Sequence, residues 1–126
     1  MLVLDTSSVL EVLKGSVKGR RISDMVKDDA FFITSLTAYE ILFGMKEGEE
    51  NKMSEFIEGV EILVFDSESS KKSGAIARHL KKSGNMINVV DILIAGICVE
   101  KGAEIITFDR DFGKIHGLKA RIVEEN

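Results

Sequence analysis

Short apolar runs alternate with longer amphipathic stretches along this chain. Each run ends near a polar residue and has the length of a buried strand; the runs cover residues 2–4, 31–34, 62–65 and 105–108, and a last strand is expected around residues 122–123. Between the runs, apolar residues recur at helical spacing. They predict helices over residues 6–13, around 22–26, and over 36–43, 48–60, 67–83 and 88–100, with a short helical turn near Phe112 and Ile115.

This alternation predicts the α/β class. We expect a central, mostly parallel sheet covered by helices on both faces, which is a three-layer α/β/α architecture. The length of 126 residues fits one compact domain, and the chain has no internal repeat, linker or low-complexity segment. A single domain over residues 1–126 is therefore predicted.

Polar residues and glycines mark the ends of the expected helices. The hydroxyl residues 6–8 can cap the first helix, and Gly15 ends it. One of residues 34–35 caps the helix after the second strand, and one of residues 66–67 caps the long polar helix after the third. The chain contains no proline, so its turns depend on Gly, Ser, Asn and Asp.

Composition narrows the functional classes. Apolar residues make up 44% and charged residues 30%, which indicates a globular chain, and the formal net charge of −4 argues mildly against a nucleic-acid binder unless bound metal supplies a local cation field. The one cysteine, Cys98, excludes an intramolecular disulfide and a thiolate zinc cluster and fits a reducing cytoplasm. No signal peptide and no apolar run of about 18 residues occurs, so we expect no membrane segment.

Four carboxylates stand where carboxylates are costly. Asp5 and Asp109 directly follow buried strands, and ligands of open α/β sheets bind beyond the carboxyl ends of strands. Asp91 and Glu40 lie inside apolar helical segments, with no lysine or arginine within four residues of Asp91 and only Lys46 near Glu40, off its helical face. Because a buried carboxylate needs a positive partner, the partner must come from elsewhere in the fold or be a metal ion.

The chemistry of this set selects the metal. Carboxylates without neighbouring histidine or cysteine suit Mg²⁺ or Mn²⁺ rather than Zn²⁺. Such ions can activate water and neutralise charge on a phosphodiester during in-line displacement. The set therefore predicts a hard divalent cation and phosphodiester chemistry as its use.

Each acid also has a simpler explanation. Asp5 can be only a helix N-cap, and Asp91 can be a first-turn aspartate favoured by the helix dipole. Glu40 can extend out of its helix into water. Asp111, beside Arg110, is explained by a solvated turn. The four acids together at element ends carry the hypothesis that each one alone does not.

The segments that hold these acids resemble the four acidic motifs of PIN-domain nucleases, and most of all VapC-type toxins of prokaryotic toxin–antitoxin pairs. The matching segments, in order and spacing, are residues 2–7, 35–41, 91–96 and 106–112. The resemblance covers essentially the whole chain. It implies a PIN-like fold with a central parallel sheet between helices, and cleavage of single-stranded RNA with Mg²⁺ or Mn²⁺.

The resemblance also implies a role for each acid. Asp5 and Asp91 would be the principal metal ligands, and Asp109 would bind metal directly or through water. Glu40 would be a ligand or would orient the attacking water. Supporting positions follow from the same motifs: Thr107 matches a hydroxyl residue that can hold a carboxylate or a water, and Asp111 matches an acid that is included only sometimes.

The first functional hypothesis is a cytoplasmic endoribonuclease toxin, forming a homodimer and restrained by an antitoxin that directs an arginine or lysine toward the acids. Alternatives are a housekeeping PIN nuclease in RNA processing and a non-catalytic PIN-like binding module, which predicts loss of an acid. A phosphatase of the haloacid dehalogenase type needs a second aspartate where Ser7 stands, and a receiver domain needs adjacent early acids that the chain lacks.

Other chemically active residues are explained without a site. Two basic runs, at residues 14–21 and 71–82, are solvated helix faces or, alternatively, phosphate tracks leading to the acids. His79 and His116 are far apart in sequence and lack metal-ligand spacing, and His79 is expected on the surface. Cys98 lies in an apolar helical stripe and is expected in the core, and the aromatic residues are expected to pack rather than to stack on bases.

Overall fold

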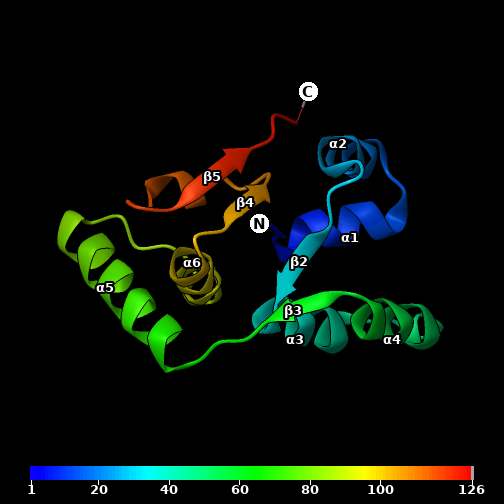
Figure 1. Cartoon of the computed structure of the whole chain (residues 1–126), viewed down its shortest axis with the longest axis horizontal. Coiled ribbons are helices and arrows are strands. Elements are labelled where there is room, and N and C mark those ends of the chain that lie inside the picture. The colour runs from blue at the N-terminus through cyan, green and yellow to red at the C-terminus, as the bar shows by residue number, and fades with distance from the viewer. Residues whose placement is uncertain (126) are drawn as a thin grey trace.

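A parallel sheet organises the molecule. The computed structural model describes residues 1–125, and its strands lie in the order β3-β2-β1-β4-β5 with every neighbouring pair parallel. The strands are β1 (Leu2–Leu4), β2 (Phe31–Thr34), β3 (Glu61–Leu63), β4 (Glu104–Thr107) and β5 (Lys119–Ile122). Helices flank the sheet on both sides (Figure 1), which confirms the predicted three-layer α/β/α class.

Six α-helices and one 3₁₀ helix connect the described strands. They are α1 (Thr6–Lys14), α2 (Val17–Val26), α3 (Ser35–Gly44), α4 (Glu50–Gly59), α5 (Ser67–Ser83), α6 (Val89–Lys101) and the 3₁₀ helix η1 (Arg110–Lys114). Every helix and strand that the hydrophobic pattern predicts is present. Within residues 1–125, no helix combines the length and apolarity that crossing a membrane requires.

Alternating side chains of the strands build a core on each face of the sheet. Val3 of β1 and Ile105 of β4 pack on one face with Phe112 and with residues of α5 and α6. Their strand neighbours Leu4 and Ile106 pack on the opposite face with residues of α1 to α4. In Figure 1, α5 and α6 accordingly lie on one side of the strands, and α1 and α2 on the other.

The edge strands differ most from the predicted ones. The run at residues 62–65 was expected to be a buried strand, but β3 ends at Leu63 and Val64 is 56% exposed, because β3 is the edge of the sheet. The backbone N–H of Phe65 instead donates to the Ser35 hydroxyl at 3.1 Å. The last strand, β5, begins at Lys119, earlier than expected. The sequence did not reveal this start because β5 is an edge strand whose residues alternate between exposed and half-buried, so it contains no apolar run.

Aspartate and threonine side chains, rather than the residues after them, begin the helices that follow the strands. Of the two N-caps considered for α1, residues 6–8 and Asp5, the structure shows Asp5: its backbone is extended and its carboxylate accepts a hydrogen bond from the backbone N–H of Ser8 at 3.1 Å. Thr34 and Asp66 cap α3 and α5 in the same way, within the predicted alternatives. Gly15 ends α1 with a positive φ of 69°, as predicted.

The strand order places the carboxyl end of β1 at a switch point. The chain passes from β1 to β2 on one side and returns later to β4 on the other side of β1. Leu4 lies opposite Ile106 in the β1–β4 register, so Asp5 and Thr107 leave the sheet next to each other. Crevices at such points are where open α/β sheets bind ligands.

Helix α2 approaches α1 very closely at Gly19. A Cβ atom at this position would lie 2.0 Å from the backbone oxygen of Glu11, which cannot move without distorting α1. The contact matters for the site because α1 begins at Asp5, at the switch point.

Gly19→Ala should lower the free energy of unfolding by about 1–3 kcal/mol, because the added methyl group forces the two helices apart. Gly74→Ala is the matched control: it is also inside a helix, and its nearest neighbour would be an arginine side-chain atom at 3.8 Å. The control should be neutral or stabilising by up to about 1 kcal/mol, since alanine favours helix. Urea unfolding measures both, and equal effects of the two substitutions would contradict the close-approach argument.

Candidate functional site

Asp5 is a buried carboxylate held by hydroxyl and amide groups. It is 5% exposed, and its Oδ2 accepts a hydrogen bond from Thr107 Oγ1 at 2.6 Å while its Oδ1 accepts from the Ser8 N–H. Burial raises the pKa of Asp5 above its ordinary value, although the hydrogen bonds from Ser8 and Thr107 oppose the rise; repulsion from Asp109 adds to it. Asp5 is therefore a helix cap, and it also places a carboxylate whose charged form is disfavoured by burial at the switch point.

Thr107 links two of the acids. Its side chain is fully buried at the end of β4, and its hydroxyl donates to Asp5 while accepting the backbone N–H of Asp109 at 2.9 Å. The hydroxyl thus uses its one donor and accepts one hydrogen bond. Thr107 therefore fixes the direction of the Asp5 carboxylate relative to the turn that carries Asp109.

Asp91 receives repulsion from every other acid of the set. It lies in the first turn of α6, whose N-cap Asn88 accepts the N–H of Val90 at 2.8 Å. The pKa of Asp91 is raised to about 6, first by burial and then by nearby negative charges; these charges belong, in decreasing order, to Asp109, Asp5, Glu40 and Asp111. Coulombic effects of this kind require short separations, so the four other acids lie close enough to repel the charge of Asp91.

Asp109 and Asp111 occupy the turn after β4. The Asp109 carboxylate caps η1 by accepting the N–H of Asp111 at 2.9 Å. The carboxylate of Asp111 pairs with Lys114 at 3.0 Å and is 41% exposed. Asp111 therefore lies at the rim with a cation of its own, whereas Asp109 faces the other acids.

Glu40 reaches the site through hydroxyl residues that sequence reasoning did not single out. Its Oε1 accepts a hydrogen bond from the hydroxyl of Thr6, the first residue of α1, and the same hydroxyl lies 3.0 Å from Thr37 Oγ1. Glu40 is half-buried and held against α1, so it does not extend into water. The available signal was the hydroxyl directly after Asp5 and the one three residues before Glu40, on the same helical face.

Within the described residues, the four acids are not neutralised by ion pairs. Among residues 1–125, no ion pair involves Asp5, Glu40, Asp91 or Asp109. In the same part of the chain, no group of three or more His, Cys, Asp or Glu side chains is placed so that it could hold a metal ion. Carboxylates that are not gathered into a cage suit Mg²⁺ or Mn²⁺, because Mg²⁺ keeps several waters and uses only one or two carboxylates. The same carboxylates do not suit Zn²⁺, which prefers tetrahedral sites with nitrogen or sulfur ligands.

The basic runs lie on different parts of the molecule. Lys18 of the first run stands 5.5 Å from the ring centroid of Phe108, which directly precedes Asp109. The second run belongs to α5, where Lys71 pairs with Glu68 on an exposed face. The first run therefore adjoins the acids, and the structure gives the second run only a helix surface.

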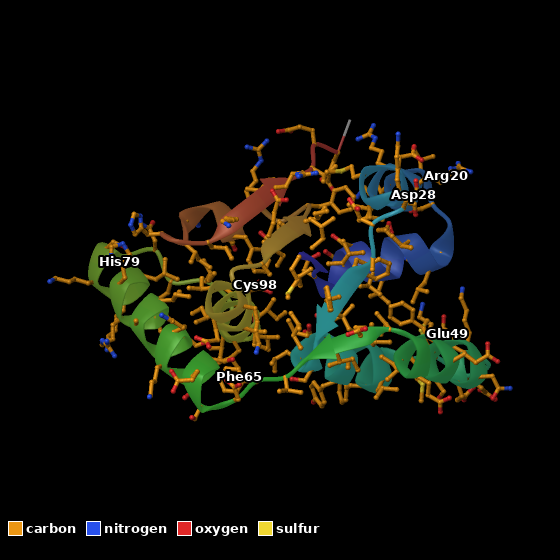
Figure 2. All side chains as sticks on the ribbon, in the orientation of Figure 1. Arg20, Asp28, Glu49, Phe65, His79 and Cys98 are labelled. Carbon is orange, nitrogen blue, oxygen red and sulfur yellow. The ribbon has the colours of Figure 1, made fainter. Side chains whose placement is uncertain are left out.

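Two residues set aside in the sequence behave differently from each other. Cys98 is fully buried in α6 (Figure 2), as predicted, and burial raises the pKa of its thiol to about 12. His79 is exposed on α5 as predicted, but its ring lies 6.5 Å from that of His116, between centroids. The fold thus brings together two histidines that are distant in sequence, beside a pocket of 260 Å³.

Comparison with known proteins gives matches along the whole chain. A model of the PIN domain matches residues 2–118. The chain is 37% identical over 95 residues to Ribonuclease VapC3 from Methanocaldococcus jannaschii, covering 75% of this chain and 95% of that protein. It is 25% identical over 123 residues to the tRNA(fMet)-specific endonuclease VapC from Salmonella typhimurium, covering 93% of each.

Solved structures share the fold. One similar structure is VapBC2 from Rickettsia felis bound to a DNA fragment from its promoter. A chain of that structure has a TM-score of 0.82 at 21% identity, and the match covers 98% of both chains. A chain of VapBC-1 from nontypeable Haemophilus influenzae has a TM-score of 0.79 at 25% identity and covers 96% of both. The architecture described above is therefore common to these structures.

In metal-free buffer, Asp91→Asn should make the protein more stable near neutral pH than the parent chain. The folded-state pKa of Asp91, about 6, lies above the ordinary value of 3.8. The protonated carboxyl is therefore fully stabilising below pH 3.8, and this stabilisation is lost as the pH rises from 3.8 through about 6. Urea unfolding in EDTA between about pH 4 and pH 7 should show the parent losing stability relative to the variant.

Asp111→Asn is the control for this measurement, because that carboxylate is more exposed and paired with Lys114. Its pH dependence should follow the parent. If Asp91→Asn leaves the pH dependence unchanged, the crowding of negative charge around Asp91 is refuted.

Proposed function

The chain belongs to the PIN-domain family, and on that premise we propose that it is a metal-dependent endoribonuclease that cleaves single-stranded RNA and is the toxin of a toxin–antitoxin pair. The observation that carries the proposal is the buried carboxylate of Asp5, fixed by Thr107 and electrostatically coupled to Asp91 without any cation of the described chain. The names of its relatives, which are ribonucleases and an endonuclease, support the reaction class. An RNA substrate places the proposed activity in the cytoplasm.

Asp5 and Asp91 would hold Mg²⁺ or Mn²⁺, with Asp109 binding it directly or through water. When bound, the ion would lower the pKa of a coordinated water and offset charge on the phosphodiester. The chain supplies the orientation: Thr107 fixes Asp5, and Thr6 fixes Glu40. Glu40 lies near these aspartates and forms no ion pair within the described chain. Its second carboxylate oxygen, which does not bind Thr6, could accept a proton from the attacking water.

An antitoxin partner fits the same electrostatics. The acid cluster has an unmet need for positive charge, which an arginine or lysine of a partner would supply, displacing metal and substrate together. Solved structures with this fold include VapBC complexes, which supports a cognate partner. The relatives' VapC names favour a toxin over a housekeeping PIN nuclease, and the presence of all four acids argues against a non-catalytic module.

Asp5→Asn should reduce Mn²⁺-dependent cleavage of single-stranded RNA by at least about 100-fold, because it removes a ligand charge while keeping the helix cap. Asp66→Asn is a closely matched control: Asp66 also caps a helix after a strand, through its Oδ1 and the Ser69 N–H at 2.8 Å, but lies outside the acid cluster. Cleavage of a labelled RNA measures both variants, and circular dichroism checks the fold. Parent-like cleavage by Asp5→Asn would refute the site.

A homodimer is part of the proposal. Helix α3 presents Tyr39 and Phe43 to solvent, stacked with ring centroids 5.8 Å apart, and Phe43 is 80% exposed. Further exposed apolar residues lie after β3 and around the start of α6: Val64, Met86 and Val89. Exposed apolar clusters of this kind on a small domain are typical of protein–protein contacts.

Phe43→Glu should shift the protein from dimer to monomer, because it places a charge in the apolar contact. Val17→Glu is the control, since Val17 is also strongly exposed but stands alone on α2. Light scattering after size-exclusion chromatography distinguishes the two states. A monomeric parent, or a dimeric Phe43→Glu variant, would contradict this interface.

A further inference from the structure

Three cations beside the acid cluster are engaged by the segment that follows β5. The Lys18 ammonium donates to the carboxylate of Glu125, and the Arg21 guanidinium donates to the backbone carbonyl of Glu124. The Arg110 guanidinium donates to the Glu124 carboxylate at 3.1 Å. These contacts join α2, η1 and the chain after β5, so they depend on the fold rather than on local sequence.

The segment is anchored directly behind the site. The backbone N–H of Val123 donates to the carbonyl of Thr107 at 2.8 Å, which extends the pairing of β5 with β4. Thr107 is the residue whose hydroxyl holds Asp5. The acidic residues 124–125 therefore emerge at a fixed place next to the acids, and not as a free end.

A pocket lies between Lys18 and two residues next to the acids, Ser7 and Phe108. It has a volume of about 290 Å³ and is lined by Ser7, Leu10, Glu11, Lys14, Lys18, Phe108 and Glu125. The Ser7 hydroxyl lies 3.4 Å from Asp5 Oδ2, and Phe108 directly precedes Asp109. A polyanion lying across the acids would therefore pass this pocket.

We propose that Lys18, Arg21 and Arg110 bind backbone phosphates of the RNA, and that Glu124 and Glu125 occupy these cations in the free protein as an internal competitor. The inference rests on the proposed function, because it takes the RNA substrate from it. A carboxylate and a phosphate oxygen make the same charge-assisted bonds to arginine and lysine. The acidic segment thus holds the cations where the phosphates will need them.

The energetics allow the exchange. The paired side chains are largely exposed: Lys18 by 42%, Glu125 by 60%, Arg110 by 78% and Glu124 by 66%. Exposed ion pairs contribute little to stability and are easily broken. The hydrogen bond to Glu125 raises the pKa of the Lys18 ammonium, and the charges of Glu125 and Glu11 add to the effect, so the contact in the free protein is between two charged groups.

Phe108 gives the pocket a second feature of single-strand binding. Its ring lies under the Lys18 ammonium, and it directly precedes Asp109. Sites for single-stranded nucleic acid combine a cationic track with aromatic faces. The proposal therefore gives Phe108, whose ring is half-buried at the pocket wall, a role in stacking on a base.

The test is RNA binding by the double variant Glu124→Gln/Glu125→Gln. Fluorescence anisotropy with a labelled single-stranded RNA in EDTA measures binding without cleavage. The variant should bind about 3- to 10-fold more tightly than the parent at low salt, and the difference should shrink at high salt, where surface ion pairs are screened. In a Lys18→Ala/Arg110→Ala background, RNA binding should be weaker and the gain from the glutamine substitutions should disappear.

Glu55→Gln/Glu58→Gln is the matched control, because it removes the same charge from exposed residues of α4. An equal gain in this control would attribute the effect to net charge and overturn the inference. The inference is also overturned if the Glu124→Gln/Glu125→Gln variant unfolds more easily but binds RNA like the parent, because the segment then has a purely structural role. In that case Asp5-dependent cleavage still stands, whereas absence of RNA binding by every variant overturns the substrate as well.

Discussion

A carboxylate held out of water beside other carboxylates is the constraint on which the site depends. Asp5 is almost fully buried, and its neighbours add negative charge instead of removing it. Such an arrangement costs free energy in the isolated chain, and it persists because the surrounding core and backbone over-determine it. A divalent cation or a cationic side chain of a partner bound here would lower this cost, so the proposed ligand binding would also stabilise the fold.

The fold supplies the means to tolerate that cost. A parallel sheet with β1 at its centre and strand order β3-β2-β1-β4-β5 brings two strand ends together at one edge. A buried hydroxyl, Thr107, then links the acids that follow these strands, and Thr6 links Glu40 to α1. Hydroxyls do this without neutralising the charge, so the cluster keeps its affinity for cations, which a lysine or arginine in the same place would remove.

The net charge of −4 and the proposed RNA substrate are reconciled by local arrangement. Negative charge is concentrated at the acids, where bound metal would offset it, and the first basic run lies near them at the pocket that includes Lys18 and Phe108. The second basic run lies on α5 and shows no comparable connection to the acids. Overall charge therefore says less about this protein than the placement of Lys18, Arg21 and Arg110.

Hydrophobic periodicity by itself determined the element types and the α/β class, because burial of apolar faces is a local, repeated requirement of strands and helices. It also located Asp5, Glu40, Asp91 and Asp109, since a carboxylate inside or directly after an apolar segment is visible in one dimension. It left the cap of α1 open between two alternatives and misplaced the ends of the edge strands, because a hydrogen bond or a place at the edge of the sheet decides these outcomes.

Only the tertiary structure decided which groups meet. The bond from Thr107 to Asp5 spans 102 positions, and the contact of Lys18 with Glu125 spans 107. No local pattern encodes such pairs, because they follow from strand register and helix packing rather than from spacing. The sequence therefore identified Asp5 and the three other acids. The fold alone determined which groups hold these carboxylates, that none of them forms an ion pair within the described chain, and which residues lie next to them.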